Sequence, residues 1–119
     1  MSDGLNMIPD VPVQIETSRG GNVAAYFVFH NRIDDPEKMQ EYIPRALETM
    51  APYNPEILIL DENSHVIEGR TTFPRTIVIK FESRDAAMAW YNSPAYQAVR
   101  PLRLAATEGF GVLVDGFRT

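Results

Sequence analysis

An aromatic and basic segment late in the chain holds the side chains best suited to binding a small molecule. Residues 90–96 read Trp-Tyr-Asn-Ser-Pro-Ala-Tyr, and Arg100 and Arg103 follow within seven positions. Aromatic rings give a pocket rigid apolar walls, and a guanidinium group can hold a carboxylate or phosphate through two parallel hydrogen bonds. The segment therefore predicts a pocket wall or an interface. The predicted substrate-binding residues are Trp90, Tyr91, Ser93, Tyr96 and Arg103.

Each of these residues also has a purely structural interpretation. Adjacent positions on a helix point about 100° apart, so we expect one of Trp90 and Tyr91 to pack on the core and the other to line an edge or interface. Ser93 could simply cap a helix, because no base lies close in sequence to activate it as a nucleophile. Tyr96 and Arg103 fall on a stripe at the margin of the helix, where an arginine could equally pair with a structural carboxylate.

Two residues outside this segment could move a proton. Glu68 follows an apolar run and precedes Gly69, so we expect it at a strand end, where aromatic neighbours would raise its pKa and allow it to act as a general base. His30 ends an apolar strand and is the second predicted catalytic residue. The structural alternatives are a Glu68–Arg103 ion pair and a hydrogen-bonded histidine. The ligand spacings typical of metal sites are missing from the sequence, and we predict neither a metal nor a cofactor.

The elements that must position these residues follow from the apolar periodicity. Alternating apolar residues predict strands over 24–30, 56–60, 75–81 and 110–117, and a further extended segment over 65–68. In the second strand we expect Ile57 and Ile59 on one face. Asp35 and Pro36 begin a helix that ends near Met50, and Ser83 begins another that restarts at Pro94. The predicted buried stripes are Met39, Ile43, Ala46 and Met50 in the first helix and Ala95, Val99, Leu102 and Ala106 in the last.

This order of elements predicts a ferredoxin-like fold. A β-α-β-β-α-β order is typical of an α+β sandwich with a four-stranded antiparallel sheet. The helices can cover only one face of that sheet, so the apolar residues of the other face need another cover. We therefore expect a homodimer with two sheets face to face. The predicted domain covers residues 23–119, and residues 1–22, rich in glycine and proline, form an amino-terminal extension.

Composition excludes several classes of protein. Eleven basic and sixteen acidic residues give a net charge of −5, which argues against a nucleic-acid partner. The absence of cysteine excludes disulfides and thiolate chemistry. No apolar run approaches the roughly 20 residues of a membrane span, and the first residues lack the features of a signal peptide. These observations predict a cytoplasmic protein without a membrane partner.

Several of the motifs above resemble one family. Asp35-Pro36, Glu68-Gly69, the Trp90–Tyr96 block and the strand before Gly116 resemble the family catalogued as domain of unknown function 1330, over about residues 23–117. The resemblance implies membership of the dimeric α/β barrel superfamily, whose members include enzymes without a cofactor. Pro44 and the amino-terminal extension look like departures from the family's pattern.

Three functions are consistent with the sequence. The first is a small enzyme that acts on a small, partly apolar, anionic molecule by acid–base chemistry, without a tightly bound cofactor; in it Arg103 anchors the anion, Trp90 and Tyr91 form walls, and Glu68 or His30 moves a proton. The second is a non-catalytic module that binds a small molecule. The third is a dimerisation domain whose aromatic block is an interface.

Overall fold

Four antiparallel strands form one sheet in a computed structural model that describes residues 23–117. The strands are β1 (Ala25–Ile33), β2 (Glu56–Asp61), β3 (Arg75–Phe81) and β4 (Thr107–Asp115), in the spatial order β2-β3-β1-β4. The central strand β1 pairs with β3 on one side and with β4 on the other. The predicted fold class, a ferredoxin-like α+β sandwich with a four-stranded antiparallel sheet, is confirmed.

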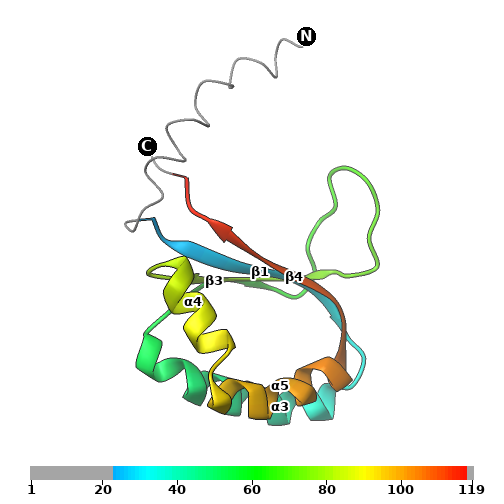
Figure 1. Cartoon of the computed structure of the whole chain (residues 1–119). Coiled ribbons are helices and arrows are strands. Elements are labelled where there is room, and N and C mark those ends of the chain that lie inside the picture. The colour runs from blue at the N-terminus through cyan, green and yellow to red at the C-terminus, as the bar shows by residue number, and fades with distance from the viewer. Residues whose placement is uncertain (1–22, 118–119) are drawn as a thin grey trace, which may run out of the picture.

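Three helices cover one face of this sheet (Figure 1). They are α3 (Pro36–Met50), followed by the short 3₁₀ helix η1 (Ala51–Tyr53), then α4 (Arg84–Tyr91) and α5 (Pro94–Ala106). Each α-helix begins at a side-chain cap that accepts a hydrogen bond from a first-turn N–H: Asp35 from Lys38, Ser83 from Ala86 and Ser93 from Tyr96. The predicted break between the last two helices is confirmed. None of the described helices is both long and apolar enough to cross a membrane.

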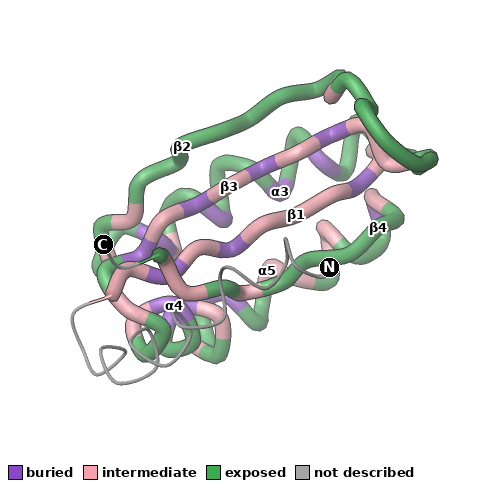
Figure 2. Tube along the Cα trace, turned by 90° about the horizontal axis from the view of Figure 1, so that it is seen from above, coloured by how far each residue is buried: buried purple, intermediate pink, exposed green. Residues whose placement is uncertain are grey.

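The core lies between the helices and the inner face of the sheet. Along β1 and β3, buried residues alternate with partly exposed ones, so each strand turns every second side chain inward (Figure 2). Trp90 is the centre of the aromatic packing, with its ring against Phe27, Phe81 and Tyr96. Burial of these four rings supplies much of the apolar stabilisation of the domain.

The outer face of the sheet carries many apolar side chains, and no element within residues 23–117 covers it. The strand registers place Val28, Val78 and Val112 side by side on this face. Both edge strands are exposed along their length, and Figure 2 shows this from the side away from the helices. Apolar side chains of this face that remain at least 40% exposed are Ile59, Phe110, Val112 and Val114.

A long loop over residues 62–74 joins β2 to β3 and extends away from the helices (Figure 1). The prediction of an extended segment over 65–68 is wrong, because these residues form bends and irregular structure. Ile67 near the middle of the loop is 79% exposed, and Glu68 beside it is also exposed. The expected placement of Glu68 at a strand end among aromatic side chains is therefore wrong as well.

Three further details differ from the sequence predictions. The last strand begins at Thr107 and ends at Asp115, earlier than predicted. In α5 the buried stripe contains Tyr96 instead of Ala95, which is exposed. The expectation that Tyr96 lies at the helix margin is thus wrong, because its side chain is fully buried. In α3, Tyr42 is buried and Ile43 is 39% exposed.

A bulge in β2 changes the faces of that strand. Ile57 pairs with Ile79 and Leu60 pairs with Ile77, so both lie on the inner face, while Ile59 pairs with Val78 on the outer face. The alternation predicted for Ile57 and Ile59 fails because one extra residue shifts the register. The predicted amino-terminal extension, residues 1–22, lies outside the described residues.

Candidate functional site

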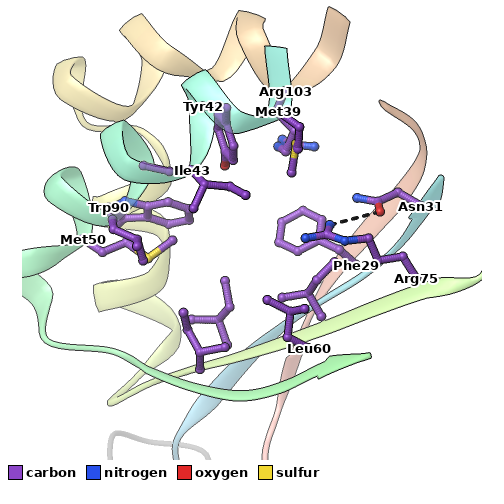
Figure 3. A pocket seen from close by; sticks show the side chains of 15 residues that line it. Phe29, Asn31, Met39, Tyr42, Ile43, Met50, Leu60, Arg75, Trp90 and Arg103 are labelled. Carbon is purple, nitrogen blue, oxygen red and sulfur yellow. Dashed lines mark hydrogen bonds between the residues drawn. The ribbon is translucent and has the colours of Figure 1, made fainter. Parts of the chain in front are cut away.

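A mostly apolar cavity lies between α3 and the inner face of the sheet (Figure 3). We call it the α3 cavity. Its volume is about 100 Å³, and its mouth is open. This volume is smaller than the roughly 150 Å³ of an enclosed cavity that binds benzene, but the mouth of the α3 cavity is open, so the apolar part of a small ligand can enter it and extend out through the mouth. The side chains that line it are Phe29, Asn31, Met39, Tyr42, Ile43, Ala46, Leu47, Met50, Ile57, Leu60, Arg75, Ile77, Ile79, Trp90 and Arg103.

One end of the α3 cavity is cationic. Arg75 is 5% exposed, and its Nη1 donates to Asn31 Oδ1 at 3.3 Å, the contact drawn in Figure 3. Its Nε donates to Glu62 at 3.2 Å, where the carboxylate comes from the β2–β3 loop and is mostly exposed. The buried guanidinium therefore has one neutral partner inside and one screened carboxylate outside.

Arg103 reaches the same cavity from α5. Its Nε donates to the Tyr96 hydroxyl at 3.1 Å, and its guanidinium lies 5.1 Å from the centre of the Phe29 ring. Among the described residues it forms no ion pair, and the oxygens that it interacts with are the hydroxyls of Tyr96 and Tyr42. Burial acts to lower the pKa of Arg103, but the oxygens of Tyr96 and Tyr42 outweigh burial and leave that pKa above its ordinary value. The guanidinium is thus charged and has free donors for an anion.

Two buried phenols connect the helices behind Arg103. The hydroxyls of Tyr42 on α3 and Tyr96 on α5 lie 2.7 Å apart, and either can donate. Burial, more than the neighbouring Tyr96, raises the pKa of Tyr42 well above its ordinary value, while Arg103 acts more weakly in the opposite direction. Tyr42 therefore stays protonated at neutral pH and can donate a hydrogen bond, but it cannot serve as a base.

The raised pKa of Tyr42 predicts a loss of stability in alkali. Above about pH 10 the unfolded chain releases this proton while the folded chain keeps it, so the free energy of unfolding should fall with pH. The slope from one tyrosine is about 1.4 kcal/mol per pH unit. We expect Tyr42→Phe to reduce the fall in the free energy of unfolding between pH 9 and 11, measured by urea unfolding, by about 1.4 kcal/mol in total, because the tyrosine of the unfolded chain titrates in the middle of this range. Equal slopes in the two proteins would contradict the assignment, and Tyr53→Phe serves as the control.

A second cavity lies between α5 and β4, on the other side of Phe29 and Arg103. We call it the α5–β4 cavity. It has a volume of about 260 Å³ and contains Tyr91 and Arg100, with the guanidinium of Arg100 5.4 Å from the centre of the Tyr91 ring. Phe29 and Arg103 line both cavities and so separate them.

The predicted substrate-binding residues are divided between these places. Trp90 is only 1% exposed and lines the α3 cavity, and Tyr91 lines the α5–β4 cavity, so one aromatic packs on the core and its neighbour lines an edge. Arg103 lines both cavities. Ser93 lines neither; its Oγ caps α5 and donates to the Trp90 carbonyl at 2.7 Å. Tyr96 is fully buried and acts on the cavities through Arg103 and Tyr42.

The two predicted acid–base residues are outside both cavities. Glu68 lies in the exposed β2–β3 loop. His30 points to the outer face of the sheet, where Nδ1 lies 3.2 Å from Thr76 Oγ1 and the ring packs on Phe110. The structural alternative, a Glu68–Arg103 ion pair, does not form, and Arg103 bonds to Tyr96 instead. The described residues contain no cluster of three or more potential metal ligands.

Three residues of the site were missed by the sequence analysis: Asn31, Tyr42 and Arg75. A usable signal was present for two of them. Asn31 and Arg75 continue the inward-facing apolar series of β1 and β3 at the same end of the sheet, where they pair with each other. A polar residue at an inward position of a strand is unusual enough to indicate a buried polar site. Tyr42 carries no such signal, because an apolar position of α3 also suits a tyrosine.

Comparisons with known proteins agree with the fold. A protein of unknown function from Rhodopseudomonas palustris superposes with a TM-score of 0.72 at 10% identity, covering 92% of this chain and 94% of that one. SnoaB, a cofactor-independent oxygenase from Streptomyces nogalater, gives 0.56 at 14% identity, with 82% and 96% covered. A dimeric ferredoxin-like protein of unknown function from Thermobifida fusca gives 0.54 at 13% identity, with 80% and 92% covered.

At these identities the structural likeness establishes the fold alone. A search of curated proteins finds no significant match. The sequence pattern of one family matches residues 24–117, which is nearly the whole of the described chain. On the strength of that match, the protein belongs to the family described as Domain of unknown function (DUF1330).

Proposed function

We propose that this protein binds a small, largely apolar molecule that carries one anionic oxygen group, with the apolar part in the α3 cavity and the anion at Arg103. The observation that carries the proposal is a charged guanidinium at the end of an apolar cavity, with more N–H donors than its two tyrosine partners accept. A buried cation without a counter-ion is costly, and an anionic ligand would relieve that cost.

The composition of the cavity supports a ligand of this class. Met39, Ile43, Ala46, Leu60 and the other aliphatic side chains offer shape and apolar contact but no directional bonds. Pockets of this kind bind through apolar contact, and a few polar groups set the orientation of the ligand. Arg103 and Arg75 supply that polarity here.

An enzyme is the second form of the proposal. SnoaB, which has the same fold, is a cofactor-independent oxygenase. Arg103 could stabilise negative charge that develops on a substrate oxygen, as donors do in an oxyanion hole. Among the described residues neither a carboxylate nor an imidazole lines the α3 cavity, so the site contains no ordinary general base. Catalysis here without a cofactor would suit a substrate that is already ionised at neutral pH.

Binding can be tested with benzoate and its neutral analogue benzyl alcohol. We expect calorimetry to show tighter binding of benzoate, and Arg103→Met to weaken benzoate by about tenfold while changing benzyl alcohol little, because a charged hydrogen bond contributes about 1.5–3 kcal/mol. Ala46→Leu should fill the cavity and weaken both probes. Ala98→Leu makes the same change at an exposed position of α5 and is the control.

Binding of benzoate that is unchanged by Arg103→Met and by Ala46→Leu would refute the proposal. If Arg103→Met weakens benzoate binding and Ala46→Leu does not, Arg103 binds the anion but the apolar part of the ligand does not lie in the α3 cavity.

We also propose that the outer face of the sheet packs on the same face of a second copy. The exposed apolar side chains of β2 and β4 lie on the same face as those of the central strands, and contiguous exposed apolar surface of this kind is typical of an interface between proteins. The β2–β3 loop extends past this face, so it would pass beside the second sheet (Figure 1). A neighbour in fold is dimeric, which agrees with this arrangement.

Val112→Lys tests the assembly. A lysine in the middle of the outer face would bury an unpaired charge between the sheets, so we expect sedimentation velocity to show a dimer for the unchanged protein and a monomer for the variant. Met88→Lys, at a partly exposed position on α4, should stay dimeric. A monomer before any substitution would exclude this interface.

A further inference from the structure

The α5–β4 cavity contains a buried donor that has no acceptor. The Nε atom of Arg100 is buried, and it has no hydrogen-bond partner in the described part of the chain. Leaving such a donor unpaired costs about 1–3 kcal/mol, and more for a charged group. Buried polar atoms without a partner are rare, so this one indicates a group that binds at the site.

The same cavity carries two positive charges with no compensating carboxylate. Arg100 and Arg103 both line it, and neither forms an ion pair with any residue of the described range. The remaining side chains of the lining are apolar or aromatic, and they belong to Phe27, Phe29, Tyr91, Leu104 and Leu113. Because these walls limit screening by water, the two cations create a strong local preference for an anion.

Aromatic rings hold both guanidinium groups in place. Arg100 stacks over Tyr91 and Arg103 stacks over Phe29, at 5.4 and 5.1 Å from the ring centres. Stacking restricts the guanidinium planes before a ligand arrives and so lowers the entropy lost on binding. Opposite them, Gly109 and Gly111 of β4 present backbone without side chains. The resulting space of about 260 Å³ accommodates a carboxylate or phosphate together with part of the molecule that carries it.

We infer that the α5–β4 cavity is an oxyanion site in which Arg100 and Arg103 together bind a carboxylate or phosphate group. This site is additional to the α3 cavity. Arg100 belongs to it alone, whereas Arg103 contributes to both. Two forked donors on one helix suit an oxyanion, because each can form parallel bonds to two oxygen atoms.

Arginine Nε–H resonances of the full-length ¹⁵N-labelled protein report this binding directly. Sodium acetate and sodium phosphate are titrated at constant ionic strength, with sodium chloride as the reference salt. We expect the Arg100 and Arg103 resonances to shift in a saturable way with at least one of the two anions, and not with chloride. Saturation by acetate alone identifies a carboxylate site, and saturation by phosphate alone identifies a phosphate site.

Variants separate this site from the α3 cavity. In these variants binding is followed through the Arg103 resonance. Arg100→Gln should raise the dissociation constant for the anion at least tenfold. Arg100→Lys keeps the positive charge but loses the paired donors of the guanidinium, and it should raise this constant at least threefold. Arg45→Gln removes an exposed arginine of α3 and should change nothing. Ala46→Leu fills the α3 cavity and should leave anion binding in the α5–β4 cavity unchanged. A failure of the proposed ligand binding in the α3 cavity can therefore be told apart from a failure of this inference. Chemical-shift changes that rise linearly with salt concentration, or that equal those seen with chloride, would overturn the inference. So would a dissociation constant that is unchanged in both Arg100 variants.

Discussion

Replacing Trp90 by alanine should lower the free energy of unfolding by about 3–5 kcal/mol, the usual cost of deleting a buried large aromatic side chain. The indole is almost completely buried and packs against Phe27, Phe81 and Tyr96. Its Nε1 also donates to Thr49 Oγ1 at 3.0 Å, which connects α4 to α3. Urea unfolding followed by circular dichroism would measure the change.

Two further variants divide this loss into its parts. Thr49→Val removes the acceptor of the indole N–H, together with the bond that the Thr49 hydroxyl donates to the Ala46 carbonyl, and leaves the indole N–H buried, so we expect a cost of about 1–3 kcal/mol. Met88→Ala shortens a partly exposed side chain on the same helix and should cost less than about 1 kcal/mol. A Trp90→Ala loss as small as that of Met88→Ala would mean that the aromatic cluster does not stabilise the domain.

Gly109→Ala should be the most damaging substitution of a small residue, with a cost of about 3 kcal/mol or more. Gly109 has a φ of +148°, in a region that other residues rarely adopt. A Cβ there would collide with the His30 carbonyl oxygen and lie 2.6 Å from the Asn31 Cα, both on the paired strand β1. Backbone strain and overpacking each cost about 1–3 kcal/mol, and neither can relax without separating the strands.

Gly69 provides the matched comparison. Its φ of +85° is also positive, but a Cβ there would meet nothing within 4 Å, because the β2–β3 loop is open. Gly69→Ala should therefore cost only the backbone term, about 1–2 kcal/mol. Thermal unfolding of the two variants side by side isolates the steric part. Equal losses of stability in the two variants would show that β4 and β1 can move apart enough to accept a Cβ at position 109.

Short-range rules account for the parts of the fold that the sequence predicted correctly. Asp35, Ser83 and Ser93 are recognisable as helix starts because capping is local. In each case the side-chain oxygen accepts a hydrogen bond from the backbone N–H three residues later. The inward series of β3 followed from alternation alone. These signals need no knowledge of the rest of the chain.

The errors arose where distant parts of the chain decide the outcome. Tyr42 and Tyr96 meet across two helices, and no local pattern pairs residues so far apart. The bulge in β2 depends on how that strand fits β3, so strict alternation misassigned Leu60. Glu68 was expected in a strand because the apolar pair before it looked buried, whereas Val66 and Ile67 are exposed on the loop. The catalytic roles of His30 and Glu68 and the substrate-binding roles of the aromatic residues stay predictions.

The strand order β2-β3-β1-β4 also has a consequence for biosynthesis. β1 occupies the middle of the sheet, yet both of its neighbours come much later in the chain. At roughly 5–20 residues per second, a ribosome needs on the order of ten seconds after β1 to reach Asp115, where β4 ends. During this time the apolar β1 has two unpaired edges, so the nascent chain is a candidate for chaperone binding until β4 is complete. Pairings this distant along the chain also place the domain among the slower-folding topologies.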